Sequence, residues 1–315
     1  MNVMFVADDN YIEPLIVALN SIFVNNPIAV HVFLVSDGLK KENLALVQDF
    51  ITKNGGGLHY IQCDLEVDAG KMQSQQWGTI VYQRIYGMFH IKEEKILYLD
   101  CDLIVDKSLK ELYDTELGAY YAAAVRDSGM DQFFINGSSH IKKLMIDDVN
   151  EYFNSGVLLL NLKKIQVELT LGSLMEKIDK YGDIFLFPDQ DLLNMVWKKK
   201  VKFIDLKYNR IATDFAYRKQ IEKDTQVVIY HYTGNKPWEK WDRNGRQGYQ
   251  WCISKYLQYS NIPEAQNIHR LTQRYNYKLK DFILSKLKTR RGYNPFVCIK
   301  KADWKTFWDY LFFYV

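Results

Sequence analysis

The sequence lacks the features that mark exported, disulfide-stabilised and membrane-spanning proteins. Its four cysteines form no CxxC pair, which predicts reduced thiols in a cytoplasmic protein, most of them packing residues. No stretch approaches the ~18 uncharged apolar residues of a membrane helix. The chain opens on MNVMFVADD, without the basic and apolar regions of a secretory leader. We therefore expect a cytoplasmic protein without a membrane span.

Internal repeats and low-complexity tracts are also missing, and the composition is ordinary for a globular protein. The 315 residues are 48% hydrophobic and 25% charged, and this length allows one large core or a core with an appendage. The aromatic content of 15%, with 22 Tyr and 17 Phe, is high. It indicates a thick core, although stacking surfaces for sugars or bases are an alternative.

The net charge of +3 conceals two regions of opposite sign. Residues 266–315 hold 11 Lys and Arg against 3 Asp, a local charge of +8 that leaves −5 for the rest of the chain. Two regions of opposite sign suggest two roles. We predict a globular domain over residues 1–262 and a basic, aromatic segment over residues 263–315.

Short apolar stretches alternate with helical patterns, which predicts an α/β domain with a mostly parallel sheet flanked by helices. Ligands in such sheets bind at the carboxyl ends of the strands. The expected strands are residues 3–7, 30–38, 58–64, 95–106, 120–127, 157–162 and 227–234. The expected helices are residues 14–23, 44–51, 79–89 and 188–197.

Two carboxylates interrupt the apolar stretch ILYLDCDLIVD, residues 96–106. In a strand, Asp100 and Asp102 point to one face and Cys101 to the other. Two adjacent carboxylates repel unless a cation separates them, and oxygen ligands favour Mg²⁺ or Mn²⁺. Such an ion keeps positions open for a diphosphate. The alternative is an exposed strand end with two solvated aspartates.

The stretch HYTGNKPW combines an imidazole, a flexible backbone and a cation in one short loop. His231 is an acceptable third ligand for Mn²⁺, and Lys236 could neutralise a phosphate oxygen. The alternative is a core histidine beside a surface lysine.

Two further stretches place small or polar groups beside apolar segments. In FPDQDLLN, Pro188 could open a helix whose first turn holds Asp189, Gln190 and Asp191. These acids are either partners of the helix dipole or groups that reach into a cleft. In YFNSGVLLLNL, Asn154 and its two neighbours bring hydrogen-bonding groups to a buried strand.

Taken together, six stretches in order over residues 1 to about 240 resemble family 8 glycosyltransferases, which include bacterial lipopolysaccharide galactosyl- and glucosyltransferases and glycogenin. The resemblance implies a GT-A fold and transfer with retention at the anomeric carbon. The six stretches are FVADDNY, YQRIY, YLDCDLIV, FNSGVLLLNL, FPDQDLLN and HYTGNKPW.

The resemblance also implies a UDP-sugar donor, UDP-galactose or UDP-glucose, and roles for particular residues. Asp100, Asp102 and His231 would bind Mn²⁺, with Mg²⁺ as the alternative ion. The nucleotide and diphosphate would lie beside Ala7, Asp8, Asn10, Cys101, Gly234 and Lys236, with Cys101 packing inward. The donor sugar would lie beside Arg84, Asp127, Asn154, Ser155, Asp189 and Gln190.

Gln190 and Asp189 are the catalytic candidates. An amide is a poor nucleophile, so same-face attack by the acceptor hydroxyl, assisted by the leaving phosphate, is preferred. Asp189 would orient the sugar or stabilise positive charge at its anomeric carbon. The Lys236 loop is one residue shorter than the family pattern. Ser155 replaces an alanine of the galactosyltransferases, which leaves the hexose open.

The basic segment alternates cations with aromatic residues, as in a helix lying on anionic lipid, with Trp304 and Trp308 near the headgroups. A subdomain packed on the core is the alternative, and no base-reading motif supports nucleic acid.

The acceptor would be a glycan or glycolipid. A nucleotidyltransferase should have a glycine-rich basic loop after the first strand, where ADDNYIEP is acidic. A non-catalytic sugar-binding module is the third reading.

Overall fold

The computed structural model describes residues 1–67, 79–128, 130, 137–212, 226–233, 236–238, 247–260 and 262. All of them belong to the first of the two units into which the chain divides, Met1–Asn267. The predicted basic helix after residue 262 lies outside the described residues. None of the helices in the described ranges combines the length and the apolar character that a membrane span requires.

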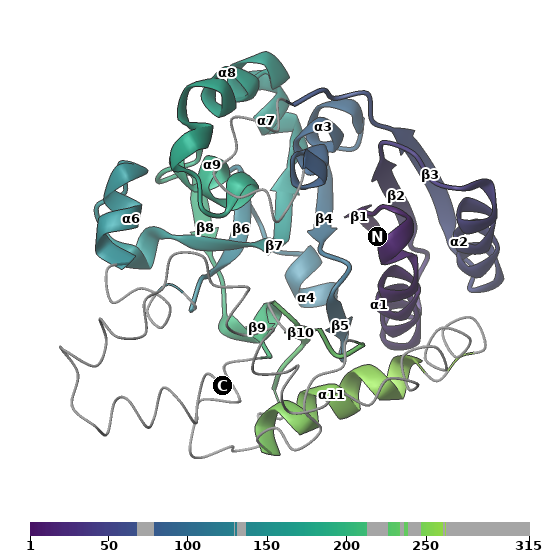
Figure 1. The fold of residues 1–315 in the computed structure, drawn as a ribbon. Helices are drawn as coiled ribbons and strands as arrows, with labels where there is room; N and C mark the ends of the chain where they lie inside the picture. The colour runs from purple at the N-terminus through teal and green to yellow at the C-terminus, as the bar shows by residue number, and fades with distance from the viewer. Residues whose placement is uncertain are drawn as a thin grey trace, which may run out of the picture. The chain divides into compact units, whose positions relative to one another are not determined.

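In the described part of the chain, a seven-stranded sheet forms the centre of the fold (Figure 1). Its strand order is β3–β2–β1–β4–β7–β6–β8. β7 runs antiparallel to its neighbours β4 and β6, while the other pairs are parallel. The predicted mixed, mostly parallel sheet is therefore confirmed. The strands are β1 (Asn2–Val6), β2 (His31–Ser36), β3 (Gly57–Gln62), β4 (Lys95–Leu99), β6 (Ala122–Arg126), β7 (Phe153–Asn161) and β8 (Val201–Phe203).

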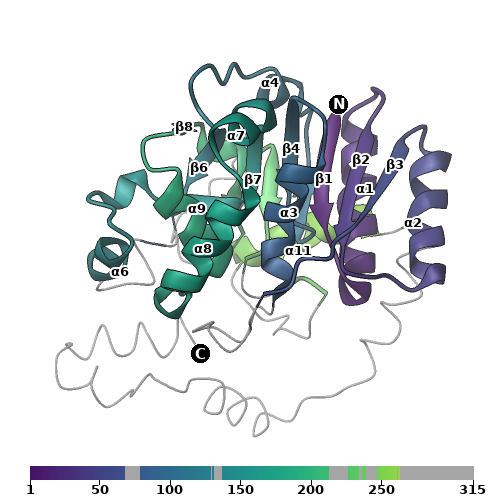
Figure 2. The same ribbon diagram turned by 90° about the horizontal axis from the view of Figure 1, so that it is seen from above.

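Helices cover both faces of this sheet (Figure 2). Because side chains alternate along a strand, Val3 and Phe5 pack with α1 (Ile12–Asn25) and α2 (Lys41–Lys53). The opposite face packs with α3 (Gln83–His90), α7 (Leu162–Glu168) and α9 (Pro188–Val196). The other helices in the described ranges are α4 (Lys110–Tyr113), α6 (Gly137–Lys143), α8 (Leu171–Tyr181) and α11 (Gln247–Ser260). Short 3-10 turns are η1 (Asp9–Tyr11), η3 (Thr79–Tyr82), η4 (Val149–Glu151), η5 (Gly182–Ile184) and η6 (Leu206–Tyr208).

A second, three-stranded sheet corrects the prediction of one strand over residues 95–106. β4 ends at Leu99, and the chain then crosses into a sheet of β5 (Leu103–Val105), β10 (Ile229–His231) and β9 (Arg210–Ile211). The Asp100 amide donates to the Gly156 carbonyl of the first sheet at 2.9 Å, and the Asp102 carbonyl accepts from Tyr232 N at 2.8 Å. The two aspartates therefore lie where the chain passes between two sheets, and not within one strand.

Gly87 allows α3 to approach the sheet closely. A methyl group at this position would lie 2.8 Å from Met4 Sδ and 2.9 Å from Val35 Cγ2. We expect Gly87→Ala to lower the free energy of unfolding by about 1–3 kcal/mol in urea denaturation, although alanine is the better helix former.

The matched control is Gly172→Ala in α8, where the new methyl group would meet only Thr170 Oγ1, at 4.0 Å. At this position only the higher helix propensity of alanine should matter, and we expect the free energy of unfolding to rise by up to about 1 kcal/mol. Equal effects of the two substitutions would contradict the close packing of α3.

Candidate active site

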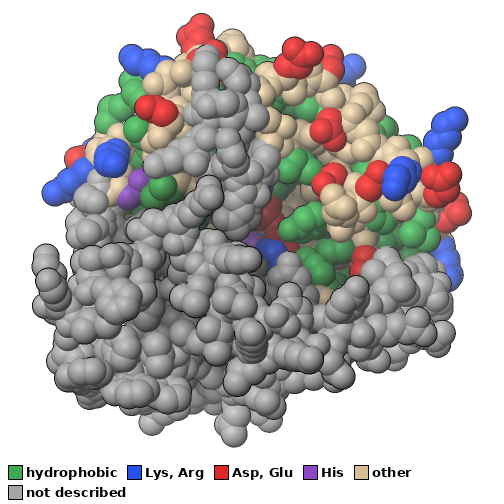
Figure 3. All heavy atoms as spheres, viewed as in Figure 1, with side chains coloured by type: hydrophobic (Ala, Val, Ile, Leu, Met, Phe, Trp, Pro, Cys, Tyr) green, Lys and Arg blue, Asp and Glu red, His purple; other side chains and the backbone are tan. Residues whose placement is uncertain are grey.

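Polar side chains from distant parts of the sequence meet at the edge where β1 and β4 end and β7 begins. Because β7 is antiparallel to β4, the first residues of β7 lie beside the last residues of β4. β10 adds His231 at its own carboxyl end, and α9 adds its first turn. On the face shown in Figure 3, acidic and basic side chains are interspersed over the described surface.

Asp100, Asp102 and His231 form a three-residue acid–imidazole cluster. One ligand atom from each lies within 4.8 Å of the others. His231 Nε2 is 3.5 Å from Asp100 Oδ2 and 3.3 Å from Asp102 Oδ1. Two carboxylates and an imidazole are donors that suit Mn²⁺ or Mg²⁺. The residues present therefore fit a divalent cation.

Asn209 holds the imidazole ring of His231 in place. Asn209 Nδ2 donates to Asn154 Oδ1 at 2.8 Å, so its Oδ1 faces His231 Nδ1 at 2.9 Å. The Nδ1–H group therefore donates to Asn209, and Nε2 points toward the two carboxylates. Contacts of this kind fix the orientation of metal-binding histidines.

Two buried cations already pair with the aspartates. Arg84 Nη2 donates to Asp100 Oδ1 at 3.0 Å, and the Lys236 ammonium contacts Asp102 Oδ2. Lys236 also donates to the Tyr232 carbonyl at 3.0 Å. The chain supplies its own positive charges.

These neighbours decide the ionisation of the cluster. Burial opposes the charged carboxylates, but Arg84 and His231 lower the pKa of Asp100, while Lys236 and His231 lower the pKa of Asp102. Burial also opposes a charged His231, but the two aspartates raise its pKa to about 9. At neutral pH both acids of the cluster are therefore ionised, and His231, Arg84 and Lys236 are the cationic groups beside them.

The residues predicted beside the donor sugar also come together. Arg84 Nη1 lies 2.9 Å from Asp189 Oδ2, which accepts from Ser155 Oγ at 3.0 Å. Gln190 Nε2 donates to Asp127 Oδ2 at 2.9 Å. Asp127 also accepts from Asn154 Nδ2 at 3.1 Å. All six side chains are at least nine-tenths buried.

The predicted nucleotide residues lie at the end of β1. The Asp8 carboxylate caps η1, accepting from the Asn10 and Tyr11 amides at 3.0 and 3.2 Å and from Asn10 Nδ2 at 2.9 Å. Ala7 is buried. Cys101 is a packing residue whose Sγ donates to the Val6 carbonyl at 3.2 Å, as predicted. Gly234 lies outside the described residues.

Sequence reasoning missed three residues that support the site: Tyr98, Asn209 and Tyr152. Tyr98 donates to Asp100 Oδ1 at 2.5 Å and stacks under the Arg84 guanidinium; its position two residues before Asp100 could have indicated this. No pattern in the sequence around Asn209 or Tyr152 indicates their roles. Asp191 was named with Asp189 and Gln190, and the structure places its carboxyl group in the interior, where Tyr152 contacts it.

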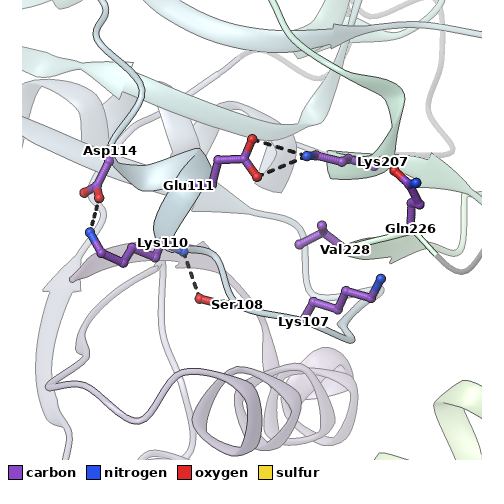
Figure 4. A pocket seen from close by; sticks show the side chains of 8 residues that line it. All are labelled: Lys107, Ser108, Lys110, Glu111, Asp114, Lys207, Gln226 and Val228. Atoms are coloured by element: carbon purple, nitrogen blue, oxygen red, sulfur yellow. Dashed lines mark hydrogen bonds and ion pairs between the residues drawn. The ribbon is translucent and has the colours of Figure 1, made fainter.

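A separate cavity of about 610 Å³ contains none of the predicted residues. It lies beside α4, and two of its lysines are paired: Lys207 donates to both Glu111 oxygens at 3.0 and 3.3 Å, and Lys110 contacts Asp114 (Figure 4). We do not assign the cavity to the reaction.

Comparison with known proteins adds independent findings. The profile of Glycosyl transferase family 8 matches residues 2–242. A lipopolysaccharide 1,2-glucosyltransferase of Escherichia coli is 29% identical over 293 residues, 88% of this chain and 84% of that protein. The galactosyltransferase LgtC, solved with donor and acceptor sugar analogs, matches with a TM-score of 0.68 and 27% identity, over 85% of this chain and 100% of that one. The glycosyltransferase GlyE of Streptococcus pneumoniae matches with a TM-score of 0.63 and 25% identity, over 88% and 65%.

Gly156 is the point where the backbone of β7 touches the acid–imidazole cluster. A methyl group there would lie 2.2 Å from His231 Cε1 and 2.7 Å from Asp100 Oδ2. We expect Gly156→Ala to displace His231 and to weaken Mn²⁺ binding by at least about tenfold in calorimetric titration. Mn²⁺ binding as tight as in the wild type would contradict the placement of the cluster.

Proposed function

Because the chain belongs to glycosyl transferase family 8 and has the GT-A fold, we propose that this glycosyltransferase is a retaining hexosyltransferase. Its donor is UDP-galactose or UDP-glucose, its acceptor is a hydroxyl of a glycan or glycolipid, and it uses Mn²⁺ or Mg²⁺. One observation carries the proposal. Arg84 contacts both Asp100 of the acid–imidazole cluster and the buried Asp189.

In this proposal Asp100, Asp102 and His231 hold the cation, which when bound supplies positive charge for the diphosphate leaving group. Lys236 is a second positive charge at the same place, because its ammonium group contacts Asp102. Arg84 contacts Asp100, Lys236 contacts Asp102 and Asn209 contacts His231, so the ligand atoms are oriented before the donor arrives. Preorganised charges of this kind stabilise the charge that develops in a transition state.

The part of the site that is proposed to bind the hexose contains groups that can stabilise positive charge. Asp189 is held by Arg84 and Ser155, so its carboxylate is fixed near the place proposed for the hexose. The Gln190 amide is fully hydrogen-bonded, with Oε1 accepting from Ser155 N at 2.9 Å. This supports a same-face attack by the acceptor hydroxyl, with Asp189 and Gln190 stabilising the anomeric carbon and neither serving as a nucleophile.

The proposal is tested by incubating the protein with Mn²⁺ and each of a panel of UDP-hexoses, without acceptor, and measuring the UDP that is released. Slow hydrolysis of UDP-galactose or UDP-glucose is expected. Binding of a UDP-sugar without any turnover would support a non-catalytic sugar-binding module instead. Absence of both binding and turnover would overturn the UDP-sugar assignment.

Asp102→Asn removes one ligand charge and leaves Lys236 without its carboxylate partner. We expect metal-dependent UDP binding to weaken by about 10- to 100-fold or more in calorimetry, with the fold retained by circular dichroism. Asp114→Asn is the matched control, because Asp114 is 55% exposed and pairs with Lys110. Unchanged UDP binding in Asp102→Asn would show that the metal site is misplaced.

We also propose that the basic segment, residues 263–315, attaches the protein to the cytoplasmic face of the membrane. Its charge of +8 over residues 266–315 and its interleaved aromatics support this. The intact protein should sediment with anionic vesicles, and a protein truncated after Gln266 should stay in the supernatant. Equal sedimentation of both would exclude the segment as the anchor.

A further inference from the structure

A chain of hydrogen bonds leads from the Gln190 amide into the protein interior. Gln190 Nε2 donates to Tyr152 Oη at 3.1 Å, and Tyr152 Oη donates to Asp191 Oδ1 at 2.5 Å. Tyr152 and Asp191 are completely buried. Neither can touch a substrate, so each would act on the reaction through a neighbouring group, and Gln190 is the neighbour to which this chain of hydrogen bonds leads.

Asp191 is a buried carboxyl group that no Arg or Lys among the described residues contacts. Its Oδ2 accepts from the Leu186 and Phe187 amides at 2.7 and 3.0 Å and lies 3.0 Å from His140 Nε2. A buried carboxylate needs such donors to remain stable. The carboxylate therefore fixes the chain entering α9 and keeps one oxygen for Tyr152.

These contacts use every hydrogen-bonding group of the Gln190 amide. One Nε2 hydrogen goes to Asp127 and the other to Tyr152, while Oε1 accepts from Ser155 N. The amide therefore has one orientation. Both of its hydrogens are drawn toward anions, directly to Asp127 and through Tyr152 to Asp191. Such chains strengthen cooperatively, which increases the negative partial charge on Oε1.

We propose that Tyr152 and Asp191 are positioning residues that orient and polarise the Gln190 amide. The inference rests on the proposed transferase reaction, in which Gln190 Oε1 stabilises positive charge at the anomeric carbon. Removing the Tyr152 hydroxyl leaves one buried Nε2 hydrogen without a partner and allows the amide to turn. The rate of the chemical step should therefore decrease, while the affinity for the donor should stay nearly unchanged.

Tyr152→Phe is the first test. We expect kcat for UDP-hexose hydrolysis to fall about tenfold while KM for the donor and the affinity for Mn²⁺ change less than about threefold. Tyr82→Phe is the matched control, because Tyr82 is equally buried in the same apolar cluster and its hydroxyl has no hydrogen-bond partner among the described residues. Equal kcat values for the two variants would overturn the proposal.

A double-mutant cycle with Gln190→Ala separates positioning from a general loss of stability. If Tyr152 acts through Gln190, Tyr152→Phe should lower kcat in the wild-type background and have no further effect in Gln190→Ala. Asp191→Asn should show the same dependence on Gln190, with folding checked by thermal denaturation. Additive losses would contradict the proposal.

A measurement that needs no turnover completes the test. In protein labelled with ¹⁵N-glutamine, the Gln190 side-chain NH₂ signal is identified by its absence in Gln190→Ala. Its hydrogen exchange should become faster in Tyr152→Phe and stay unchanged in Tyr82→Phe; unchanged exchange in Tyr152→Phe would overturn the positioning role. Absence of turnover in the wild type, with faster exchange in Tyr152→Phe, would overturn the proposed reaction and leave the orientation of Gln190 established.

Discussion

The double contact of Arg84 is the interaction on which the rest of the site depends. Its guanidinium reaches Asp100 at 3.0 Å and Asp189 at 2.9 Å, and it stacks on the Tyr98 ring. A planar group with a fixed fork of donors can hold two carboxylates in one geometry, which the single ammonium of lysine cannot. Without it, Asp100 just after β4 and the buried Asp189 of α9 would lose the cation that contacts both of them. Arg84 thus joins the acid–imidazole cluster to the buried polar side chains around Asp189.

The two sheets explain why these acids can gather at one place. A continuous strand would bury residues 100–102 in a hydrogen-bonded ladder, whereas the passage from β4 to β5 leaves their side chains beside β7 and β10. Gly156 lets the backbone of β7 come close to His231. Around this junction, hydrogen bonds run from His231 through Asn209, Asn154 and Asp127 to Gln190. The acid–imidazole cluster and the buried polar side chains around Gln190 therefore share one hydrogen-bond network.

The sequence predicts those features of the fold and site that depend on the spacing of apolar residues and on the order of strands and helices. The alternation of strands and helices gives the α/β class, and Asp8, Asp100 and His231 follow apolar strands as expected of ligand sites. The break after Leu99 could not be predicted, because apolar residues continue on both sides of it. Partners such as Asn209 and Tyr152 come from distant elements, and no spacing marks them. The pairing of Lys236 with Asp102 likewise requires the folded chain.

We propose that the acid–imidazole cluster beside Arg84 is the cation site of a UDP-sugar enzyme. Anomalous diffraction at the manganese edge, from crystals grown with Mn²⁺ and UDP, is the direct test of this site. We expect one strong peak between Asp100, Asp102 and His231, with the UDP diphosphate bound to the same ion. A peak at any other acidic group, or a diphosphate bound away from these three residues, would contradict it.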